Sequence, residues 1–396
     1  MDYDFITTCN WTSTGTYTLR AYRGSNTNVV TTYYSSIFYR KKGTTTWTAL
    51  NSSGQMVIDS TGEWEVANDW NKSGNDCLTH SYSGITAINS CTDVYFNETS
   101  LGTTVGNSFL YTCWYNCTSL TSMGTFNLPT GITSVGSRFL YTCWSGCTSL
   151  TSMSVGFNLP TGITSVGDYF LAGCWERCTS LSSMPSGFNI PSGITTVGSY
   201  FLYYCWYNCT SLSSMPSGFN IPTGITSVGD DFLSNCWNSC TSLSSMPTGF
   251  NLPTGITSVG DYFLFQCWRD CTSLTSMPVG FNLPTGIITV GNYFLGYCWY
   301  GCTSLKSMPI GFNIPADIIS VGNYFLYRSW YDCTLLKADG YTENIDFKYA
   351  AGGAFGGTCP ITPDSPAANS SVAVNREKSP KIIGVQSLIG VSSIAF

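Results

Sequence analysis

Residues 161–191 read TGITSVGDYFLAGCWERCTSLSSMPSGFNIP, and close copies of this stretch recur along the chain. The Val-Gly pair inside it returns eight times, at Val105, Val135, Val166, Val197, Val228, Val259, Val290 and Val321. The copies occupy residues 102–340, and SGITAI at 83–88 resembles a partial unit that would cap them. Because a unit of this length cannot bury an apolar face by itself, the repetition predicts a stacked repeat solenoid.

Each unit contains two short strand candidates in which apolar residues alternate with Thr or Ser. One is the Leu-Thr-Ser-Met type at 120–123, and the other is Gly-Ile-Thr-Ser-Val at 131–135. Such alternation is typical of a strand with one buried face. Stacking therefore predicts two parallel β-ladders, with neighbouring strands about 4.8 Å apart.

Between the two strands, the segment typified by 109–117 predicts a short helix. Five of its positions keep nearly the same residue type in every unit: Phe109, Leu110, Cys113, Trp114 and Cys117. Positions 111, 112, 115 and 116 vary. At about 100° per residue, the constant set falls within one arc of about 140°. The pattern predicts one helix per unit with a buried constant face and an exposed variable face.

The repeats also match a known pattern. The matching residues are Cys-Thr-Ser-Leu at 147–150, Thr-Ser-Met at 151–153, Leu-Pro at 159–160 and Ile-Thr-Ser-Val-Gly at 163–167. On these residues, the chain resembles the BspA-like leucine-rich repeats of bacterial and phage surface proteins. The resemblance implies a parallel leucine-rich-repeat solenoid used for adhesion or recognition, and it implies no catalytic residues. The present unit is longer, with an added Trp and an extra upstream Cys.

The flanking regions have a different composition. Residues 1–79 contain strand-like segments at 16–22, 31–42, 44–50 and 62–68, separated by Gly, Asn and Ser turns. They predict an antiparallel β-sandwich, similar to immunoglobulin or fibronectin type III domains, that serves as a docking domain. The solenoid domain is expected at 80–340. Residues 341–396 predict a Gly/Pro/Ser linker followed by a C-terminal β tail.

Charge and composition exclude several functions. Only 10% of the residues are charged, the net charge is −6, and no basic run is present, which argues against nucleic-acid partners. His80 is the one histidine, so a histidine-based metal site is not expected. No apolar stretch approaches the ~20 residues of a membrane span. We find no catalytic motif, and we expect no enzyme activity and no cofactor. If Met1 is the true start, the chain carries no secretory signal.

The 19 cysteines allow two interpretations. Seven units contain Cys-x3-Cys, and both positions fall on the constant face, where cysteine behaves as a small buried hydrophobic residue. Disulfides within a unit are the alternative, although residues four apart on a helix are poorly directed for one. Cys77 and Cys91 can form a further pair near the cap. The repeated Trp and Met positions are expected in the core.

The variable face supplies the candidate ligand-binding residues. They are Tyr115, Asn116, Glu176, Arg177, Tyr207, Asn208, Arg269, Asp270, Tyr331 and Asp332. We expect a non-enzymatic virion surface protein, such as a phage fibre, spike or decoration subunit, that forms homo-oligomers or joins other virion subunits. Its ligand would be a host-surface glycan or protein. The alternative is a secreted bacterial cell-surface adhesin or extracellular filament subunit, glycosylated at sequons such as those of Asn116 and Asn208.

Overall fold

The computed structural model describes residues 3–24, 31–70, 76–309, 312, 314–315 and 317–336. The tail predicted at 341–396 lies outside these residues. The chain divides into two units, one formed by Met1–Ile194 with Asn208–Leu212 and the other by Thr195–Tyr207 with Ser213–Phe396. Both units contain stacked repeats, and the first also contains the N-terminal sheets.

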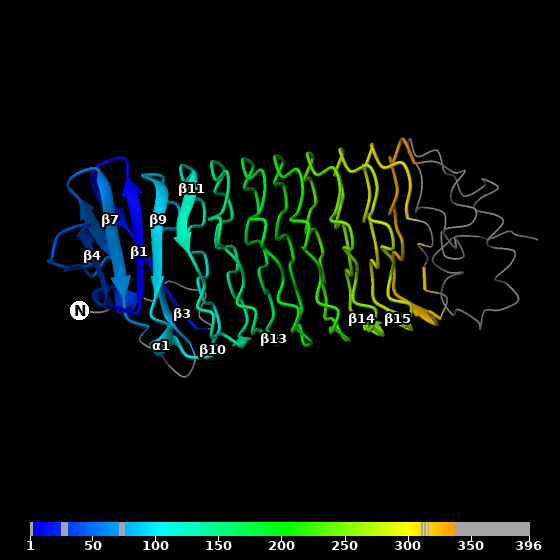
Figure 1. The fold of residues 1–396 in the computed structure, drawn as a ribbon, viewed down its shortest axis with the longest axis horizontal. Helices are drawn as coiled ribbons and strands as arrows, with labels where there is room; N and C mark the ends of the chain where they lie inside the picture. Colours follow the sequence, from blue (N-terminus) through cyan, green and yellow to red (C-terminus); the bar gives the residue numbers. More distant parts are fainter. Residues whose placement is uncertain are drawn as a thin grey trace, which may run out of the picture. The chain divides into compact units, whose positions relative to one another are not determined.

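The first unit begins with a six-stranded sheet in the order β11-β9-β1-β7-β4-β5 (Figure 1). Its strands are β1 (Phe5–Trp11), β4 (Ile37–Lys41), β5 (Thr48–Ala49), β7 (Gly62–Asn68), β9 (Ile88–Phe96) and β11 (Ser122–Phe126). Two small antiparallel sheets pair β2 (Gly15–Thr18) with β6 (Gln55–Ile58), and β3 (Arg20–Arg23) with β8 (Leu78–Ser81). The helices are the 3-10 helix η1 (Thr31–Ser36) and the one-turn α1 (Glu98–Leu101).

The N-terminal strands agree in part with the predicted antiparallel sandwich. Strands occur within the segments expected at 16–22, 44–50 and 62–68. In the segment expected at 31–42, only the second half is extended, as β4, because the first half winds into η1 and buries Tyr34. The domain boundary at residue 79 stays a prediction.

Strand β9 joins the N-terminal sheet to the repeats, because it pairs antiparallel with β1 and parallel with β11. Gly124 of β11 approaches β9 so closely that a Cβ atom would lie 2.2 Å from the carbonyl oxygen of Thr92. Glycine has no Cβ, so Gly124 permits this pairing. The first repeat therefore hydrogen-bonds to β9 instead of presenting an open sheet edge.

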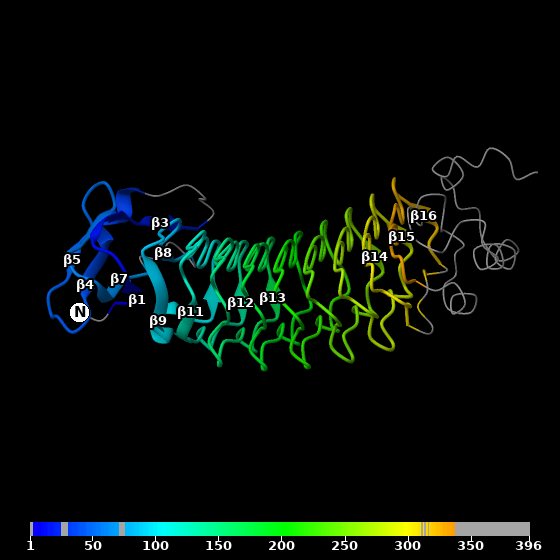
Figure 2. The same cartoon turned by 90° about the horizontal axis from the view of Figure 1, so that it is seen from above.

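Two parallel ladders run through the repeats of each unit, as predicted (Figure 2). The first consists of β10 (Thr104–Val105), β12 (Ser134–Val135) and β13 (Ser165–Val166) in one unit, and β14 (Ser258–Val259), β15 (Thr289–Val290) and β16 (Ser320–Val321) in the other. The second consists of bridges between single residues, Ser122–Ser152–Ser183 and Ser214–Ser245–Ser276–Ser307. The repeat solenoid expected from the sequence is therefore confirmed.

The helix predicted between these strands is wrong. In the described part of the chain α1 and η1 are the only helices, and 108–117 and its equivalents, here called the coil, form a series of turns. Within the coil, alternate residues near its start have left-handed backbone, with φ of 54° at Leu110 and 49° at Thr112. The same alternation is present in every described repeat. An α-helix needs right-handed backbone at each residue, so this segment cannot form one.

The peptide groups of the coil bond to neighbouring repeats instead of along a helix. The amide of Trp114 donates to the carbonyl of Cys143 at 2.8 Å, and the amide of Leu140 donates to the carbonyl of Phe109 at 2.9 Å. Other amides close tight turns within the repeat. Side chains then point inward and outward in alternating pairs, with a period of about four residues. Nine residues are too few to distinguish this period from the 3.6 of a helix.

Replacing Leu264 by isoleucine should therefore cost more than replacing Leu274. Both leucines are fully buried, but Leu264 has a φ of 54° and Leu274 does not have a positive φ. A β-branched side chain clashes with left-handed backbone. We expect Leu264→Ile to lose about 2 kcal/mol more unfolding free energy than Leu274→Ile. Urea unfolding of the two variants measures the difference, and equal midpoints would contradict the left-handed coil.

Stacked aromatic columns form the core of each unit. In the second unit, the Trp237 ring lies 5.5 Å from that of Trp206 and 5.6 Å from that of Trp268. Phe219 and Phe250 meet the same indole edge-on. The first unit stacks Trp114, Trp144 and Trp175 in the same way. The repeated Trp and Met side chains are buried, which confirms the prediction that they belong to the core.

The repeat cysteines are buried as well, in agreement with the packing interpretation. The second cysteine of a pair donates its Sγ–H to the tryptophan carbonyl of the preceding repeat, as from Cys271 to Trp237 at 3.0 Å. Burial raises the pKa of Cys147 to about 12, so this thiol keeps its proton. No disulfide joins the described cysteines, and Cys91 faces Cys9 across the β1–β9 pair instead of bonding to Cys77.

Candidate functional site

The predicted binding residues lie on the outer side of the coil. All ten are at least partly exposed: Tyr115, Asn116, Glu176, Arg177, Tyr207, Asn208, Arg269, Asp270, Tyr331 and Asp332. They belong to five different repeats, so they do not form one cluster. Their role in binding stays a prediction.

The second residue of each predicted pair has a backbone role that sequence reasoning missed. Asn116, Arg177, Asn208, Asp270 and Asp332 all have φ between 55° and 60°. Gly146 and Gly301 occupy the same coil position with φ of 76° and 70°. Asn, Asp and Gly are the residue types that tolerate left-handed backbone best. The frequency of Asn, Asp and Gly at this coil position was the available signal in the sequence. The left-handed backbone explains much of the residue variation at this position without a ligand.

Charges within the predicted pairs partly neutralise one another. Arg177 Nε lies 3.5 Å from Glu176 Oε1, and Arg269 Nε lies 3.2 Å from Asp270 Oδ2. Burial raises the pKa of Glu176, while Arg177 opposes this. Neighbouring charges of opposite sign leave little net field for a ligand. The charged pairs alone therefore do not define a binding site.

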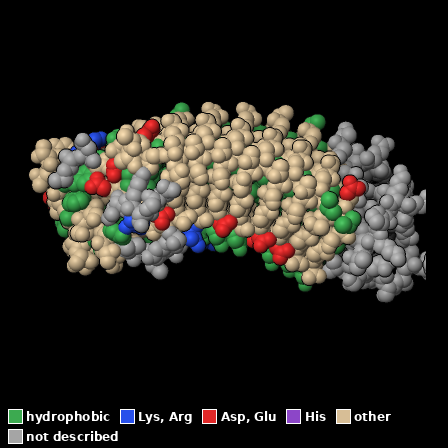
Figure 3. Space-filling view, turned by 90° about the horizontal axis from the view of Figure 1, so that it is seen from below, with side chains coloured by type: hydrophobic (Ala, Val, Ile, Leu, Met, Phe, Trp, Pro, Cys, Tyr) green, Lys and Arg blue, Asp and Glu red, His purple; other side chains and the backbone are tan. Residues whose placement is uncertain are grey.

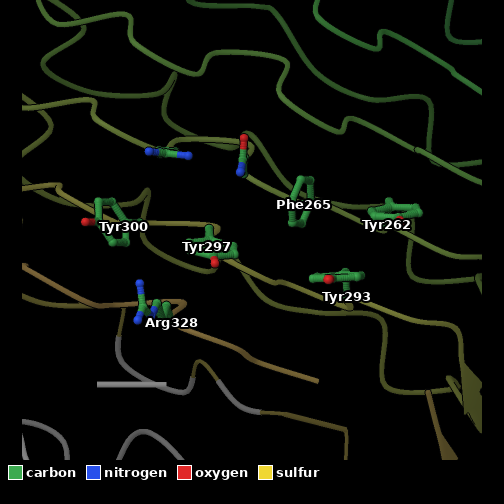
Figure 4. A pocket seen from close by; sticks show the side chains of 8 residues that line it. Tyr262, Phe265, Tyr293, Tyr297, Tyr300 and Arg328 are labelled. Carbon is green, nitrogen blue, oxygen red and sulfur yellow. The ribbon is translucent and has the colours of Figure 1, made fainter. Parts of the chain in front are cut away.

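A pocket opens on the outer side of the coil in the second unit (Figure 4). Its volume is about 470 Å³. The lining comes from three successive repeats and consists of Tyr262, Phe265, Gln266, Arg269, Tyr293, Tyr297, Tyr300 and Arg328. Of the ten predicted residues, Arg269 is the one in this lining. The pocket thus combines aromatic rings, two guanidinium groups and one amide on neighbouring turns of the chain.

The pocket occurs where the outer column of rings is interrupted. Phe265 is followed at the same coil position by Gly296 and then by Tyr327. A Cβ on Gly296 would lie 3.2 Å from the Phe265 ring and 3.3 Å from the Tyr293 ring, so both rings pack closely against the glycine. The ring of Tyr297 lies edge-on to both Phe265, at 5.9 Å, and Tyr327, at 5.3 Å. The two rings that pack against Gly296, those of Phe265 and Tyr293, both line the pocket.

The rings occupy one end of the pocket. Tyr262 and Tyr293 stack with their centroids 5.1 Å apart, and Phe265 meets Tyr293 edge-on at 5.3 Å. Figure 4 shows these three rings together, with Tyr297 between them and the pair Tyr300 and Arg328. Such contacts fix the orientation of each ring. The result is a set of flat apolar faces whose tyrosines also carry hydroxyl groups.

The two arginines occupy the other end. Arg269 Cζ lies 5.0 Å from the ring centre of Tyr300, and Arg328 Cζ lies 4.9 Å from that of Tyr331. Stacking on a ring holds a guanidinium plane in place while its N–H edge can still donate hydrogen bonds. Arg269 also bonds to Asp270, whereas no carboxylate among the described residues pairs with Arg328. This end of the pocket is therefore positive.

Two of the pocket tyrosines, Tyr293 and Tyr297, keep their hydroxyl protons at neutral pH. Burial raises the pKa of Tyr293 and of Tyr297, and neighbouring tyrosines raise both further. For Tyr297, Arg328 and Arg269 act in the opposite direction, but the net pKa shift is upward. These groups can therefore donate and accept hydrogen bonds as neutral phenols.

With the repeat geometry established, comparison with known proteins identifies the family. The model of the BspA type leucine rich repeat region matches residues 96–335 in six copies. The chain belongs to the BspA type leucine-rich repeat family. The match to this BspA-type chain confirms the resemblance of its repeat motifs to the family. Membership groups it with surface-displayed, adhesin-like repeat proteins of bacteria.

Solved structures of other leucine-rich repeat proteins are similar to this BspA-type chain. One from Bacteroides ovatus ATCC 8483 is 17% identical, with a TM-score of 0.32, covering 68% of this chain and 67% of the other. The T. pallidum leucine rich repeat protein is 18% identical, with a TM-score of 0.31 and coverages of 63% and 82%. The pneumococcal vaccine antigen PcpA is 14% identical, with a TM-score of 0.30 and coverages of 61% and 54%. No curated protein matches the chain.

The described residues of this BspA-type chain lack two other kinds of feature. They contain no group of three or more His, Cys, Asp or Glu side chains arranged to hold a metal ion. Nor do they include a helix long and apolar enough to cross a bilayer.

Proposed function

We propose that the chain is a non-enzymatic binding protein displayed on a surface, and that the pocket of the second unit is its recognition site. The observation that carries this proposal is the convergence of rings and arginines from three successive repeats on one hollow. Tyr and Arg are enriched among the residues that dominate recognition surfaces. The pocket volume also falls within the range of small-ligand sites.

The repeats support binding by holding the pocket in shape. Gln266, Trp268 and Tyr297 each donate a backbone hydrogen bond to the following repeat, at 2.9, 2.9 and 2.7 Å. In the core of the same repeats, Phe263 and Phe294 stack with centroids 5.4 Å apart. A lining held by backbone bonds and core packing loses little conformational freedom when a ligand binds. The scaffold thus acts by pre-organisation.

In its finer form, the proposal is a virion surface protein, such as a phage fibre, spike or decoration subunit that forms homo-oligomers or joins other subunits. Buried, protonated cysteines such as Cys147 support assembly in a reducing cytoplasm, where thiols are kept reduced. The host-surface ligand would be a glycan or a protein. A secreted bacterial adhesin or filament subunit is the competing proposal, supported by the family to which the chain belongs.

Mass spectrometry of purified particles and of cell envelopes separates these two proposals. A virion protein should be abundant in purified particles, whereas an adhesin should be found in envelopes and should carry sugars if its sequons are used. The recognition role is tested separately with purified full-length chain on immobilised host-cell surfaces. Binding should be lost in Phe265→Ala, and equal binding by wild type and variant would overturn the pocket as the recognition site.

A further inference from the structure

Resting on the function proposed above, we infer that the pocket binds an acidic saccharide, meaning a sugar that carries a carboxylate. The inference names the ligand class for the pocket, using the two kinds of group that line it. Rings at one end match the apolar face of a pyranose, and guanidinium groups at the other match the carboxylate.

The aromatic end has the properties of a sugar-binding surface. A pyranose presents a face of C–H groups, which packs against an aromatic ring, and a rim of hydroxyls, which needs hydrogen-bonding partners. Tyr262, Phe265 and Tyr293 offer ring faces and edges held in place by mutual contacts of 5.1–5.3 Å. Tyrosine hydroxyls and the Gln266 amide provide polar groups beside them. A purely apolar ligand would leave these polar groups without partners.

The arginine end favours a planar anion over a neutral group. Two guanidinium groups line the same hollow, and the carboxylate nearest to either is that of Asp270, which bonds to the Nε of Arg269. A guanidinium fork matches the two oxygens of a carboxylate. Because Arg328 already stacks on a tyrosine ring at 4.9 Å, little side-chain freedom is lost on binding. The arginine end of the pocket thus has an excess of positive charge, which can pair with the carboxylate of a ligand.

The charge of the chain as a whole argues for one short acidic group instead of a long polyanion. The chain has a net charge of −6, and Figure 3 shows a face on which uncharged side chains and backbone predominate, with acidic patches. A polyanion such as a nucleic acid would need many cations along its path. Two arginines in one hollow suffice for a single carboxylate beside a sugar ring.

The test uses the full-length chain and two matched pairs of sugars in isothermal titration calorimetry. Trigalacturonic acid is compared with its methyl ester, and 3′-sialyllactose is compared with its methyl ester. In each pair the rings are similar and the carboxylate is absent from the second member. We expect at least one acid to bind about tenfold more tightly than its neutral counterpart. The preference should weaken as NaCl is raised, because salt screens the arginines.

Variants assign the effect to the pocket. Arg328→Gln should lower affinity for the acidic sugar about tenfold and leave affinity for the neutral sugar unchanged. Lys306→Gln removes the same charge from an exposed side chain of this unit that does not line the pocket, and it should change neither affinity. Phe265→Ala should weaken binding of both sugars. Circular dichroism of each variant verifies that the fold is retained.

The outcomes distinguish failure of this inference from failure of the proposed function. Equal affinity for acid and neutral sugar, with Phe265→Ala still reducing binding, would reject the acidic ligand and retain the pocket. Absence of binding to all four sugars would reject the saccharide, while the host-surface assay independently tests the recognition role. If Lys306→Gln reduced acid binding as much as Arg328→Gln, the effect would be general attraction by the surface, and the inference would be wrong.

Discussion

Replacing Phe263 by alanine should lower the stability of the second unit by about 3–5 kcal/mol, whereas replacing Phe265, two residues away, should cost about 1 kcal/mol. Both changes remove the same phenyl ring from the same coil. Phe263 is completely buried, and Phe265 is partly exposed in the pocket lining. Comparison of the two variants therefore isolates the contribution of the inward side of the coil to stability.

The large cost at Phe263 follows from its place in a continuous column. Its ring centroid lies 5.6 Å from that of Phe232 and 5.4 Å from that of Phe294, with nearly parallel planes. Alanine would leave a cavity between two rings that belong to neighbouring backbone turns. Those turns are also linked by amide bonds, such as Leu264 to Phe232 at 3.0 Å, so the structure cannot collapse freely into the space. Both lost burial and cavity formation then contribute.

Native-state hydrogen exchange measures this effect locally. The amides of Leu264 and Leu295 bond to the repeats before them, so their protection reports opening of the column around Phe263. In Phe263→Ala, protection of both amides should fall sharply, and in Phe265→Ala it should stay close to that of the wild type. Similar losses in the two variants would refute the assignment of inward and outward faces.

Acidification should destabilise the first unit through His80. Its imidazole is completely buried, and burial lowers its pKa from 6.5 to about 3. Between these values the unfolded chain binds a proton that folded His80 does not, so stability falls as pH decreases through this window. The loss should reach about 3 kcal/mol at pH 4 relative to pH 7. Well above pH 6.5, from about pH 8, His80 is neutral in both states and contributes no pH dependence.

The surroundings of His80 satisfy the neutral ring. Nδ1 donates to Asn68 Oδ1 at 2.7 Å, and Nε2 accepts from the Thr7 hydroxyl at 2.7 Å. Tyr82 hydrogen-bonds to the same Thr7 hydroxyl, and the Phe5 ring stacks on the imidazole at 4.4 Å. Both ring nitrogens therefore have partners without a second ring proton. A charged imidazole would occupy this enclosed site with no carboxylate partner among the described residues.

Urea unfolding from pH 7 to pH 4, followed by signals from the first unit, provides the measurement. His80→Gln removes the titrating group and retains an amide that can hydrogen-bond, so the variant should be less stable at pH 7 yet show a smaller further loss on acidification. Other carboxylates titrate in both proteins, and the difference between the two profiles isolates His80. Parallel profiles would show that His80 does not control the acid sensitivity.

The sequence predicted the architecture because repetition shows which positions the fold constrains. Val135 and Val166 mark a ladder, and Trp114 and Trp144 mark a core column, since each occurs at one position of every copy. Alternation of apolar and small polar residues then located both strands of the unit. These features depend on spacing and burial. Both can be read from this single sequence because its repeats can be aligned with one another.

The coil and the pocket depend on features that a burial pattern does not carry. Leu264 and Leu274 look alike as buried leucines, yet only the former has left-handed backbone. The Asn and Gly residues at the coil position of Asn116 and Gly146 indicated left-handed backbone there. The buried leucines with positive φ gave no such indication in the sequence. The pocket required knowledge of which coil residues lie side by side in successive repeats. Without knowledge of these neighbours, Gly296 could not be distinguished from the other substitutions at its repeat position.

The one-sided bonding of the coil has an electrical consequence for the second unit. Tyr262, Gln266, Trp268 and Asp270 all direct their amides toward the next repeat, and Leu264 alone in that coil directs its amide backward. Peptide dipoles aligned in this way add along the stack, as they do along a helix. Within the coil their sum is a dipole whose positive end faces the later repeats. Ladder amides such as that of Lys306, which donates to the carbonyl of Thr275, point the other way and offset part of it. An anion near Arg328 would therefore experience attraction from the backbone itself, in addition to that from the guanidinium.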